Sequence, residues 1–327
     1  MKAIQIRELG DDPDLRLVEI PEPRPGAGEV LVDVKAAGVN YADVLMCRGQ
    51  YGGRRPLPFV PGFEAAGVVL QVGRGVENLR PGQRVMGTVL REVCGCYAEK
   101  AVMPAWLLLP VPQSLSFEEA AAFPEVFITA HLALHVFGRL APGETVLIHA
   151  AAGGVGTAAV QIAKATGARI FATASSDEKL LRVRGLGAEV IINYTKQDFL
   201  DEVKKQTDGK GVDLVLESVG GEVFEKSLQC LRPMGRLVAY GTSGGKEGVL
   251  KPIDVRRSSL TVGGFSFGAL SVSRPDVVRQ AMAAVEELLE QRRVRPIVGH
   301  RLPLVEARAA HNLLSSRGNF GKVVLVP

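Results

Sequence analysis

Short apolar runs with polar neighbours fill the first third of the chain. The runs are rich in Val, Ile, Leu and Ala, and prolines and glycines separate them. Such runs are typical of β-strands joined by turns. Strands are expected at residues 2–6, 15–20, 28–39, 64–73, 83–89 and 97–104. The pattern therefore predicts an irregular, largely antiparallel β domain over about the first 120 residues.

From Ser116 onward the pattern changes. Ser116 and Glu119 have the spacing of a capping box, and the helical region that follows is expected to break near Pro124. Strands are then expected at 145–150, 168–174, 189–193, 212–219, 235–241 and 259–267, with helices at 154–166, 177–186, 197–207 and 222–231. Almost continuously apolar strands separated by helices predict an α/β domain with a doubly wound parallel sheet. A helix at 275–293 and strands at 295–302 and 321–327 should pack back on the first domain.

Composition narrows the class of protein. The 327 residues are 46% hydrophobic and 23% charged, which suits a globular protein of two domains. Lys plus Arg number 39 against 35 for Asp plus Glu, an excess too small and dispersed to make nucleic acid the expected partner. The four cysteines and the lack of an apolar leader or span indicate reduced thiols in a cytoplasmic protein.

A glycine-rich turn follows the strand at 145–150. Ala151, Gly153 and Gly156 hold the three positions of a G-x-G-x-x-G dinucleotide fingerprint, so alanine replaces the first glycine. Alanine fits there if its φ is negative. Gly153, Gly154, Val155 and Gly156 would then bring backbone N–H groups and a helix N-terminus to a pyrophosphate. A tight turn without a ligand is the alternative.

The end of the next strand bears on the choice of cofactor. NAD sites place an acid about 20 residues after the glycine turn, at the ribose hydroxyls. Here Ser175 and Ser176 stand at the strand end, with Asp177 and Lys179 directly after them. Hydroxyl donors and a lysine favour the 2′-phosphate of NADPH, whereas Asp177 argues for NADH. Ser176 to Lys179 also fit a plain helix start.

Several segments together resemble the zinc-free quinone oxidoreductases, the zeta-crystallin group of the medium-chain dehydrogenase/reductase superfamily. The resemblance covers the whole chain and rests on 36–51, 58–69, 115–134, 143–164, 187–194, 235–245 and 318–327. It implies a Rossmann NADP-binding domain at 125–267, inserted into a GroES-like, mainly antiparallel catalytic domain formed by 1–124 and 268–327. It also implies NADPH as the cofactor.

The resemblance bears on metal content. Zinc alcohol dehydrogenases of the superfamily have a cysteine where this chain has Asn40, and a histidine where it has Phe63. Phe63 has no metal-binding atom and an amide is a poor zinc ligand, so no metal is expected. Cys94 and Cys96 have no second cysteine pair nearby and are expected to be plain thiols. Without a Lewis acid the substrate must be easily reduced, as quinones and activated C=C bonds are.

The resemblance assigns roles to individual residues. Asn40 and Tyr51 should contact the substrate, with Tyr41 as a third member and Thr129 beside the nicotinamide. The residues implied to hold the cofactor are Thr129, the turn 151–156, Ser175, Ser176, Lys179, Tyr194, Ser218, Gly241, Thr242, Ser243, Phe265, Ser266, Phe267, Asn319 and Lys322. Structural readings stay open: a helix cap for Asn40, a back-bonded hydroxyl for Thr129, sheet-edge cover for Tyr194, and a turn for Asn319 and Lys322.

The expected activity is NADPH-dependent reduction of a quinone or another electron-poor carbonyl compound. One alternative is a reductase of enones, 2-alkenals or enoyl-thioesters, for which Arg54 and Arg55 would offer a basic groove. A second is a cofactor-binding protein with little catalysis, of the crystallin or RNA-binding type. The strand at 259–265 resembles the family's dimer strand, which predicts a homodimer and leaves no apolar edge exposed.

Overall fold

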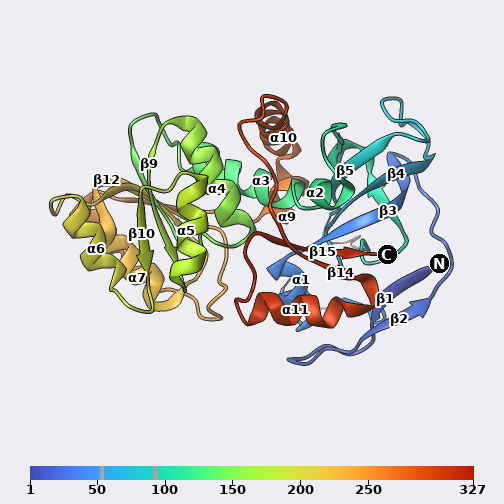
Figure 1. The fold of residues 1–327 in the computed structure, drawn as a ribbon, viewed down its shortest axis with the longest axis horizontal. Helices are drawn as coiled ribbons and strands as arrows, with labels where there is room; N and C mark the ends of the chain where they lie inside the picture. Colours follow the sequence, from blue (N-terminus) through green and yellow to red (C-terminus); the bar gives the residue numbers. More distant parts are fainter. Residues whose placement is uncertain (52–54, 91–94) are drawn as a thin grey trace. The chain divides into compact units, whose positions relative to one another are not determined.

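The computed structural model describes residues 1–51, 55–90 and 95–327, which form two compact units (Figure 1). The first unit comprises Met1–Val126 and Pro296–Pro327, and the second comprises Phe127–Arg295. Cys94 and Arg54 lie outside the described residues.

The first unit is built on a seven-stranded sheet in the order β14-β15-β3-β4-β5-β7, with β6 paired to β3. All pairings are antiparallel except that of β14 with β15. The antiparallel pairing of β15 with β3 joins the two ends of the chain in one sheet. The strands are β3 (Glu29–Val39), β4 (Glu64–Val72), β5 (Arg84–Thr88), β6 (Lys100–Pro104), β7 (Leu108–Pro110), β14 (Val298–Pro303) and β15 (Lys322–Val326), with β1 (Lys2–Ile6) and β2 (Leu15–Glu19) in a sheet of their own. The predicted antiparallel β domain is confirmed.

Short helices complete the first unit. They are α1 (Tyr41–Cys47), α2 (Phe117–Ala121), α11 (Ala307–Ser315) and the 3₁₀ turns η1 (Ala105–Leu107) and η3 (Leu304–Glu306). The predicted capping box is present: the Glu119 backbone N–H donates to the Ser116 hydroxyl at 3.2 Å, and the Ser116 N–H donates to the Glu119 carboxylate at 3.0 Å. The predicted break is present too, because α3 (Pro124–His131) begins at Pro124, where proline lacks an N–H that a helix start does not need.

The second unit is a doubly wound α/β domain. Its six strands are all parallel, in the order β10-β9-β8-β11-β12-β13. The strands are β8 (Thr145–Ile148), β9 (Arg169–Ala174), β10 (Val190–Asn193), β11 (Val212–Glu217), β12 (Leu231–Ala239) and β13 (Thr261–Gly264). The order reverses between β8 and β11, and such a reversal is where Rossmann sheets bind dinucleotides.

Helices cover both faces of this sheet (Figure 1). The helices of this unit are α4 (Gly154–Thr166), α5 (Asp177–Leu186), α6 (Phe199–Gln206), α7 (Gly221–Cys230), α8 (Pro252–Ser258), α9 (Phe267–Ser273), α10 (Pro275–Glu290) and the π-helix η2 (Leu132–Phe137), of which α4, α5, α6 and α7 lie about the sheet in Figure 1. Leu147, Phe171, Val215 and Leu237 form the buried centre of the sheet. Covered faces explain why these strands are apolar at almost every position.

Two details differ from the sequence prediction. The strand expected at 259–267 is shorter, because Ser266 caps α9 by accepting the Ala269 N–H at 3.4 Å and so turns the chain into a helix. The segment 268–295, assigned to the catalytic domain from the sequence, belongs to the second unit. Val278, Ala281 and Val285 of α10 are buried there, and an apolar helix face does not show in the sequence which domain it packs on.

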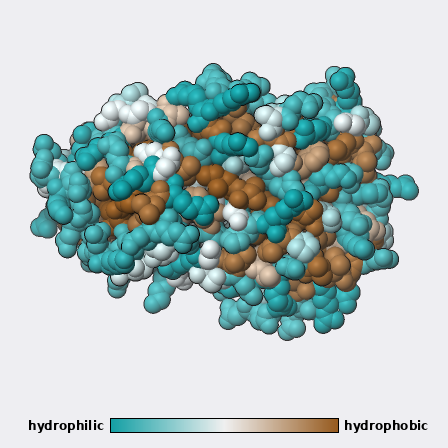
Figure 2. All heavy atoms as spheres, in the orientation of Figure 1, coloured by the Kyte–Doolittle hydropathy of each residue, from teal (hydrophilic) through white to brown (hydrophobic). Residues whose placement is uncertain are grey.

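The surface of the protein carries both hydrophilic and hydrophobic side chains. On the face drawn in Figure 2, hydrophilic side chains predominate and hydrophobic ones show through in patches. Among the described residues, no helix has both the length and the apolar character that crossing a bilayer requires.

Candidate functional site

The glycine-rich turn joins β8 to α4. Ala150, not Ala151, has the left-handed backbone, with a φ of 49°. Gly153 precedes the first turn of α4, whose leading N–H groups have no carbonyl partner four residues back. A Cβ on Gly156 would lie 2.3 Å from the Ala150 carbonyl oxygen, so only glycine allows α4 to approach the turn this closely. These features fit a pyrophosphate cradle.

The expected 2′-phosphate ligands meet at the carboxyl ends of β9 and β10. Asn193 pairs with Ala174 across these strands, and the Tyr194 N–H donates to the Ala174 carbonyl at 3.2 Å, which sets Tyr194 beside Ser175. The Ser176 hydroxyl accepts the Lys179 N–H at 3.3 Å and so caps α5. Partial burial lowers the pKa of Lys179. The helix-start reading of Ser176 is correct, and its hydroxyl hydrogen is still available to a phosphate.

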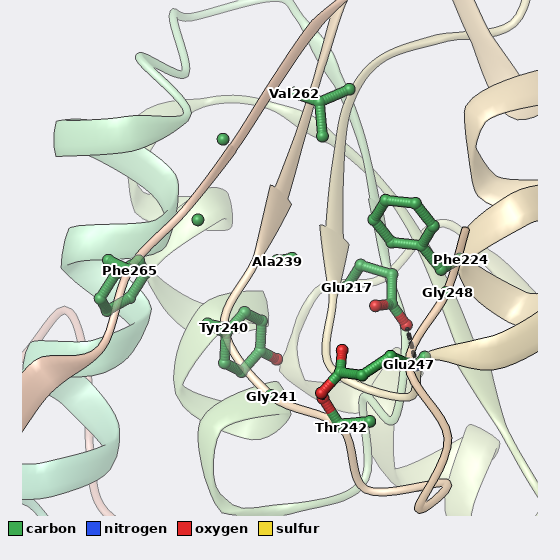
Figure 3. Close-up of a pocket in the computed structure, with 13 residues that line it drawn as sticks. Glu217, Phe224, Ala239, Tyr240, Gly241, Thr242, Glu247, Gly248, Val262 and Phe265 are labelled. Carbon is green, nitrogen blue, oxygen red and sulfur yellow. Dashed lines mark hydrogen bonds between the residues drawn. The ribbon is translucent and has the colours of Figure 1, made fainter. Parts of the chain in front are cut away.

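A cavity of about 470 Å³ opens beyond the ends of β11, β12 and β13 (Figure 3). Three expected cofactor residues line it: Gly241, Thr242 and Phe265. The neighbouring loops are held together because the Ser243 N–H donates to the Ser218 carbonyl at 2.8 Å. Ser266 and Phe267 instead begin α9. Thr129 lies in α3 with 8% of its surface exposed.

The cavity also holds groups that the sequence did not single out. Tyr240 stacks on Phe265 at 6.4 Å between ring centroids, and Phe137 stacks on the same ring at 4.9 Å. Burial raises the pKa of Tyr240 to about 12, so its hydroxyl keeps its proton. Burial also raises the pKa of Glu217, although this carboxylate accepts the Val219 and Gly220 N–H groups at 2.6 and 2.9 Å. Both side chains are drawn at the cavity in Figure 3. The sequence feature that could have identified Glu217 and Tyr240 is their position directly at strand ends.

In the first unit, Asn40 belongs to a buried polar network. Its amide nitrogen donates to Glu64 Oε1 at 2.8 Å, and its amide oxygen accepts from Lys322 Nζ at 2.7 Å. Lys322 Nζ also bonds Glu64 Oε1 and donates to the Val39 carbonyl at 3.0 Å. The Glu125 N–H donates to Glu64 Oε2 at 3.0 Å. Each group offsets the burial of another, so the amide of Asn40 is held in one orientation.

Asn40 also begins α1, as its cap reading predicts: its backbone N–H donates to Asp43 Oδ2 at 2.8 Å. Tyr41 is the first residue of α1 and is half-buried. Tyr51 packs edge-on against Phe63, with ring centroids 6.0 Å apart. The side chain of Lys322 is 3% exposed and its ammonium is engaged in this network, and its contact with the cofactor stays a prediction. The Asn319 amide donates to the Gly321 carbonyl at 2.9 Å, as in a turn before β15.

Comparison with known proteins gives a consistent result. Two family models match, the alcohol dehydrogenase GroES-like domain over residues 26–113 and the zinc-binding dehydrogenase over residues 154–287. Quinone oxidoreductase of Rattus norvegicus is 33% identical over 328 residues, covering 100% of this chain and 98% of the rat protein. The chain belongs to the medium-chain dehydrogenase/reductase superfamily. Its first unit is the GroES-like domain and its second is the Rossmann domain.

Solved structures of superfamily members agree over the full length. Quinone oxidoreductase of Escherichia coli, complexed with NADPH, is 32% identical with a TM-score of 0.92, and the match covers 100% of both chains. A structure described as an NAD-dependent alcohol dehydrogenase is 36% identical with a TM-score of 0.91, again over 100% of both chains. The superfamily therefore fixes the fold, and the reaction and cofactor must be argued from this chain's residues.

Position 63 is central to the metal question in this superfamily. Phe63 is 6% exposed and packs in the core of the GroES-like domain. Over residues 1–51, 55–90 and 95–327, no three His, Cys, Asp or Glu side chains gather as metal ligands. The described cysteines, Cys47, Cys96 and Cys230, are buried free thiols.

A second buried cluster was missed from the sequence. The Tyr97 hydroxyl donates to Asp43 Oδ2 at 3.0 Å and lies 3.3 Å from His311 Nε2. Burial raises the pKa of Asp43 to about 7, and burial lowers the pKa of His311 to about 4. The members come from residues 43, 97 and 311, so no local motif marks them.

Proposed function

We propose that this oxidoreductase transfers hydride from NADPH to quinones without zinc. The observation that carries the proposal is the Asn40–Glu64–Lys322 network. It joins an amide and a buried ammonium to Glu64, the residue that follows Phe63 in the chain, and zinc dehydrogenases of the superfamily have metal ligands at positions 40 and 63. An enzyme with these residues needs a substrate that accepts hydride unaided, and a quinone does.

The residues of the Rossmann domain fit NADPH. Gly156 keeps α4 close to a turn that suits a pyrophosphate, and Ser175, Lys179 and Tyr194 supply donors beside each other for a 2′-phosphate. When bound, NADPH supplies the hydride. The related Escherichia coli enzyme, which carries NADPH in its solved structure, supports the same cofactor here.

The chain's own side chains orient the substrate and exclude water. We propose that Tyr51, held edge-on by Phe63, forms an aromatic wall with a hydroxyl donor, and that Tyr41 lies beside it. The backbone N–H of Asn40, bonded to Asp43, fixes the start of α1, of which Tyr41 is the first residue. Negative charge that develops on a quinone oxygen is stabilised by such hydrogen-bond donors.

The test compares substrates. Chelator-treated protein is supplied with NADPH and, in separate assays, a small 1,4-quinone, a 2-alkenal and an enoyl-thioester. The proposal expects quinone turnover with kcat/KM at least about 10-fold above that for the alkenal, a difference of about 1.4 kcal/mol in barrier. Turnover confined to the alkenal or thioester would make the protein a double-bond reductase. Binding of NADPH with no turnover would make it a cofactor-binding protein.

We also propose a homodimer formed through β13. This strand pairs with β12 alone among the described strands, so its other edge offers unpaired backbone groups. Large apolar side chains in the chain segments before and after this strand are exposed: Val272 by 63%, Val249 by 57% and Leu250 by 43%. A second copy would cover both features. The buried free thiols of Cys47, Cys96 and Cys230 support a reducing, cytoplasmic setting.

A further inference from the structure

Asp177 stands where dinucleotide folds that use NAD place their ribose-binding acid. It follows the end of β9 by three residues and lies about 20 residues after the glycine turn. A carboxylate there repels the 2′-phosphate of NADPH. Yet Ser175, Ser176 and Lys179, which surround it, suit that phosphate. The structure shows how this conflict is resolved.

Two side chains from the turn after β10 hold the Asp177 carboxylate. Lys196 Nζ donates to Asp177 Oδ2 at 2.5 Å, and Asn193 Nδ2 donates to Asp177 Oδ1 at 2.6 Å. Each carboxylate oxygen therefore has its own donor. The hydrogen bonds from Asn193 and Lys196 lower the pKa of Asp177, so the acid is ionised at neutral pH and its charge has to be balanced.

Asn193 fixes the geometry of this arrangement. Its side chain is 5% exposed, and its amide oxygen accepts both the Thr195 N–H at 3.1 Å and the Thr195 hydroxyl at 2.7 Å. With the oxygen engaged, the NH₂ group must face Asp177. The turn 193–196 is thereby tied to the first residue of α5, and Lys196 is held against the acid.

The Lys196–Asp177 pair is open to solvent, with 63% and 59% of the two side chains exposed. Such a pair contributes little to folding stability. Its consequence is electrostatic: the pair has no net charge, whereas Asp177 alone would add one negative charge within a Debye length of the phosphate site. The next charged residues on α5 are Glu178 and Lys179, which have opposite charges, and Arg182 and Arg184 follow further along the helix.

We propose that Lys196 is a specificity-determining residue, which allows this chain to select NADPH over NADH by neutralising Asp177. Lys196 acts by neutralising the charge of Asp177 and not by touching the cofactor, so it is a positioning residue. The inference rests on the proposed use of NADPH. It explains how an acid at the NAD position and a phosphate-binding set of residues coexist at one strand end.

The test measures dissociation constants of NADPH and NADH by fluorescence titration at low ionic strength. We expect Lys196→Gln to weaken NADPH about 3- to 10-fold, the effect of one unpaired charge at 5 to 10 Å in a watery environment, and to leave NADH within about twofold. Asp177→Asn added to Lys196→Gln should restore NADPH binding to within about twofold of the wild type. The effect should shrink at about 0.5 M salt.

Lys226→Gln is the matched control. Lys226 forms the same kind of exposed pair in the same unit, with Asp198 at 2.6 Å, so this variant removes an equal charge elsewhere. Unchanged NADPH binding in Lys196→Gln would overturn the inference. Failure of Asp177→Asn to rescue it would also overturn the inference, because Lys196 would then contact the phosphate directly. Equal wild-type affinity for the two cofactors would instead overturn the assignment of NADPH itself.

Discussion

At the residue scale, His149 shows how a buried titratable group is kept neutral. It follows β8 directly, and its ring nitrogens lie 3.1 Å from the Thr173 hydroxyl and 2.9 Å from the Ser227 hydroxyl. Its ring also meets Phe199 edge-on at 4.8 Å. Burial lowers the pKa of His149 to about 3. The folded protein therefore keeps this ring in its neutral form at pH values well above 3.

This predicts a pH dependence of stability. The unfolded chain binds a proton at His149 below about pH 6.5 and the folded chain does not, so stability falls as pH falls from 6.5 towards 3. In urea unfolding at pH 7, 6 and 5, the wild type should lose up to about 1.4 kcal/mol per pH unit relative to His149→Gln. His300→Gln, in half-buried β14, is the control and should follow the wild type. Parallel curves for wild type and His149→Gln would contradict this account.

The sequence shows which residue types stand at the candidate site, but it does not show which other residues they contact. The sequence alone shows that Phe63 stands where zinc alcohol dehydrogenases of the superfamily have a metal-binding histidine. The engagement of Asn40 by Glu64 and Lys322 could not, because the Glu64–Lys322 contact spans 258 positions of the chain. The Asp43–Tyr97 contact spans 54. Such networks depend on strand order, which a single sequence does not give.

At the element scale, the sequence predicted correctly those features that depend only on residues close together in the chain. The capping box at Ser116, the helix start at Pro124 and the glycine turn all lie where their spacing indicated. The turn departs in one detail: the strained φ belongs to Ala150, one residue before the fingerprint position that alanine occupies. The expected strand through Phe267 failed because apolar β-forming residues concealed the Ser266 cap.

Gly156→Ala tests the turn. The new Cβ would lie 2.3 Å from the Ala150 oxygen and 2.6 Å from Ala151 Cα, so α4 must move away from the turn. We expect a loss of about 1 to 3 kcal/mol in unfolding free energy and weaker NADPH binding, measured by urea unfolding and titration. Gly185→Ala in α5 meets nothing within 4 Å and should leave stability equal or higher by up to about 1 kcal/mol. Equal effects of both changes would disprove the close-approach argument.

At the scale of the whole molecule, the two domain types could be predicted from the sequence, but the division between residues 295 and 296 could not. The β13 edge supports the proposed dimer. Light scattering at micromolar concentration should give twice the 34.9 kDa chain mass, and Val262→Pro, which removes a backbone N–H from the edge of β13 that faces away from β12, should shift the protein to monomer. A monomeric wild type would refute the dimer without affecting the argument for catalysis.

The most direct measurement for the account as a whole is quinone-dependent NADPH oxidation by protein whose zinc content has been determined. We predict full activity at less than about 0.05 zinc per chain and no gain on adding zinc. We also predict that a Lys322→Met variant loses activity, because the buried Glu64 carboxylate then has no ammonium to balance its charge. Activity that disappears with chelation and returns in proportion to bound zinc would contradict the central claim.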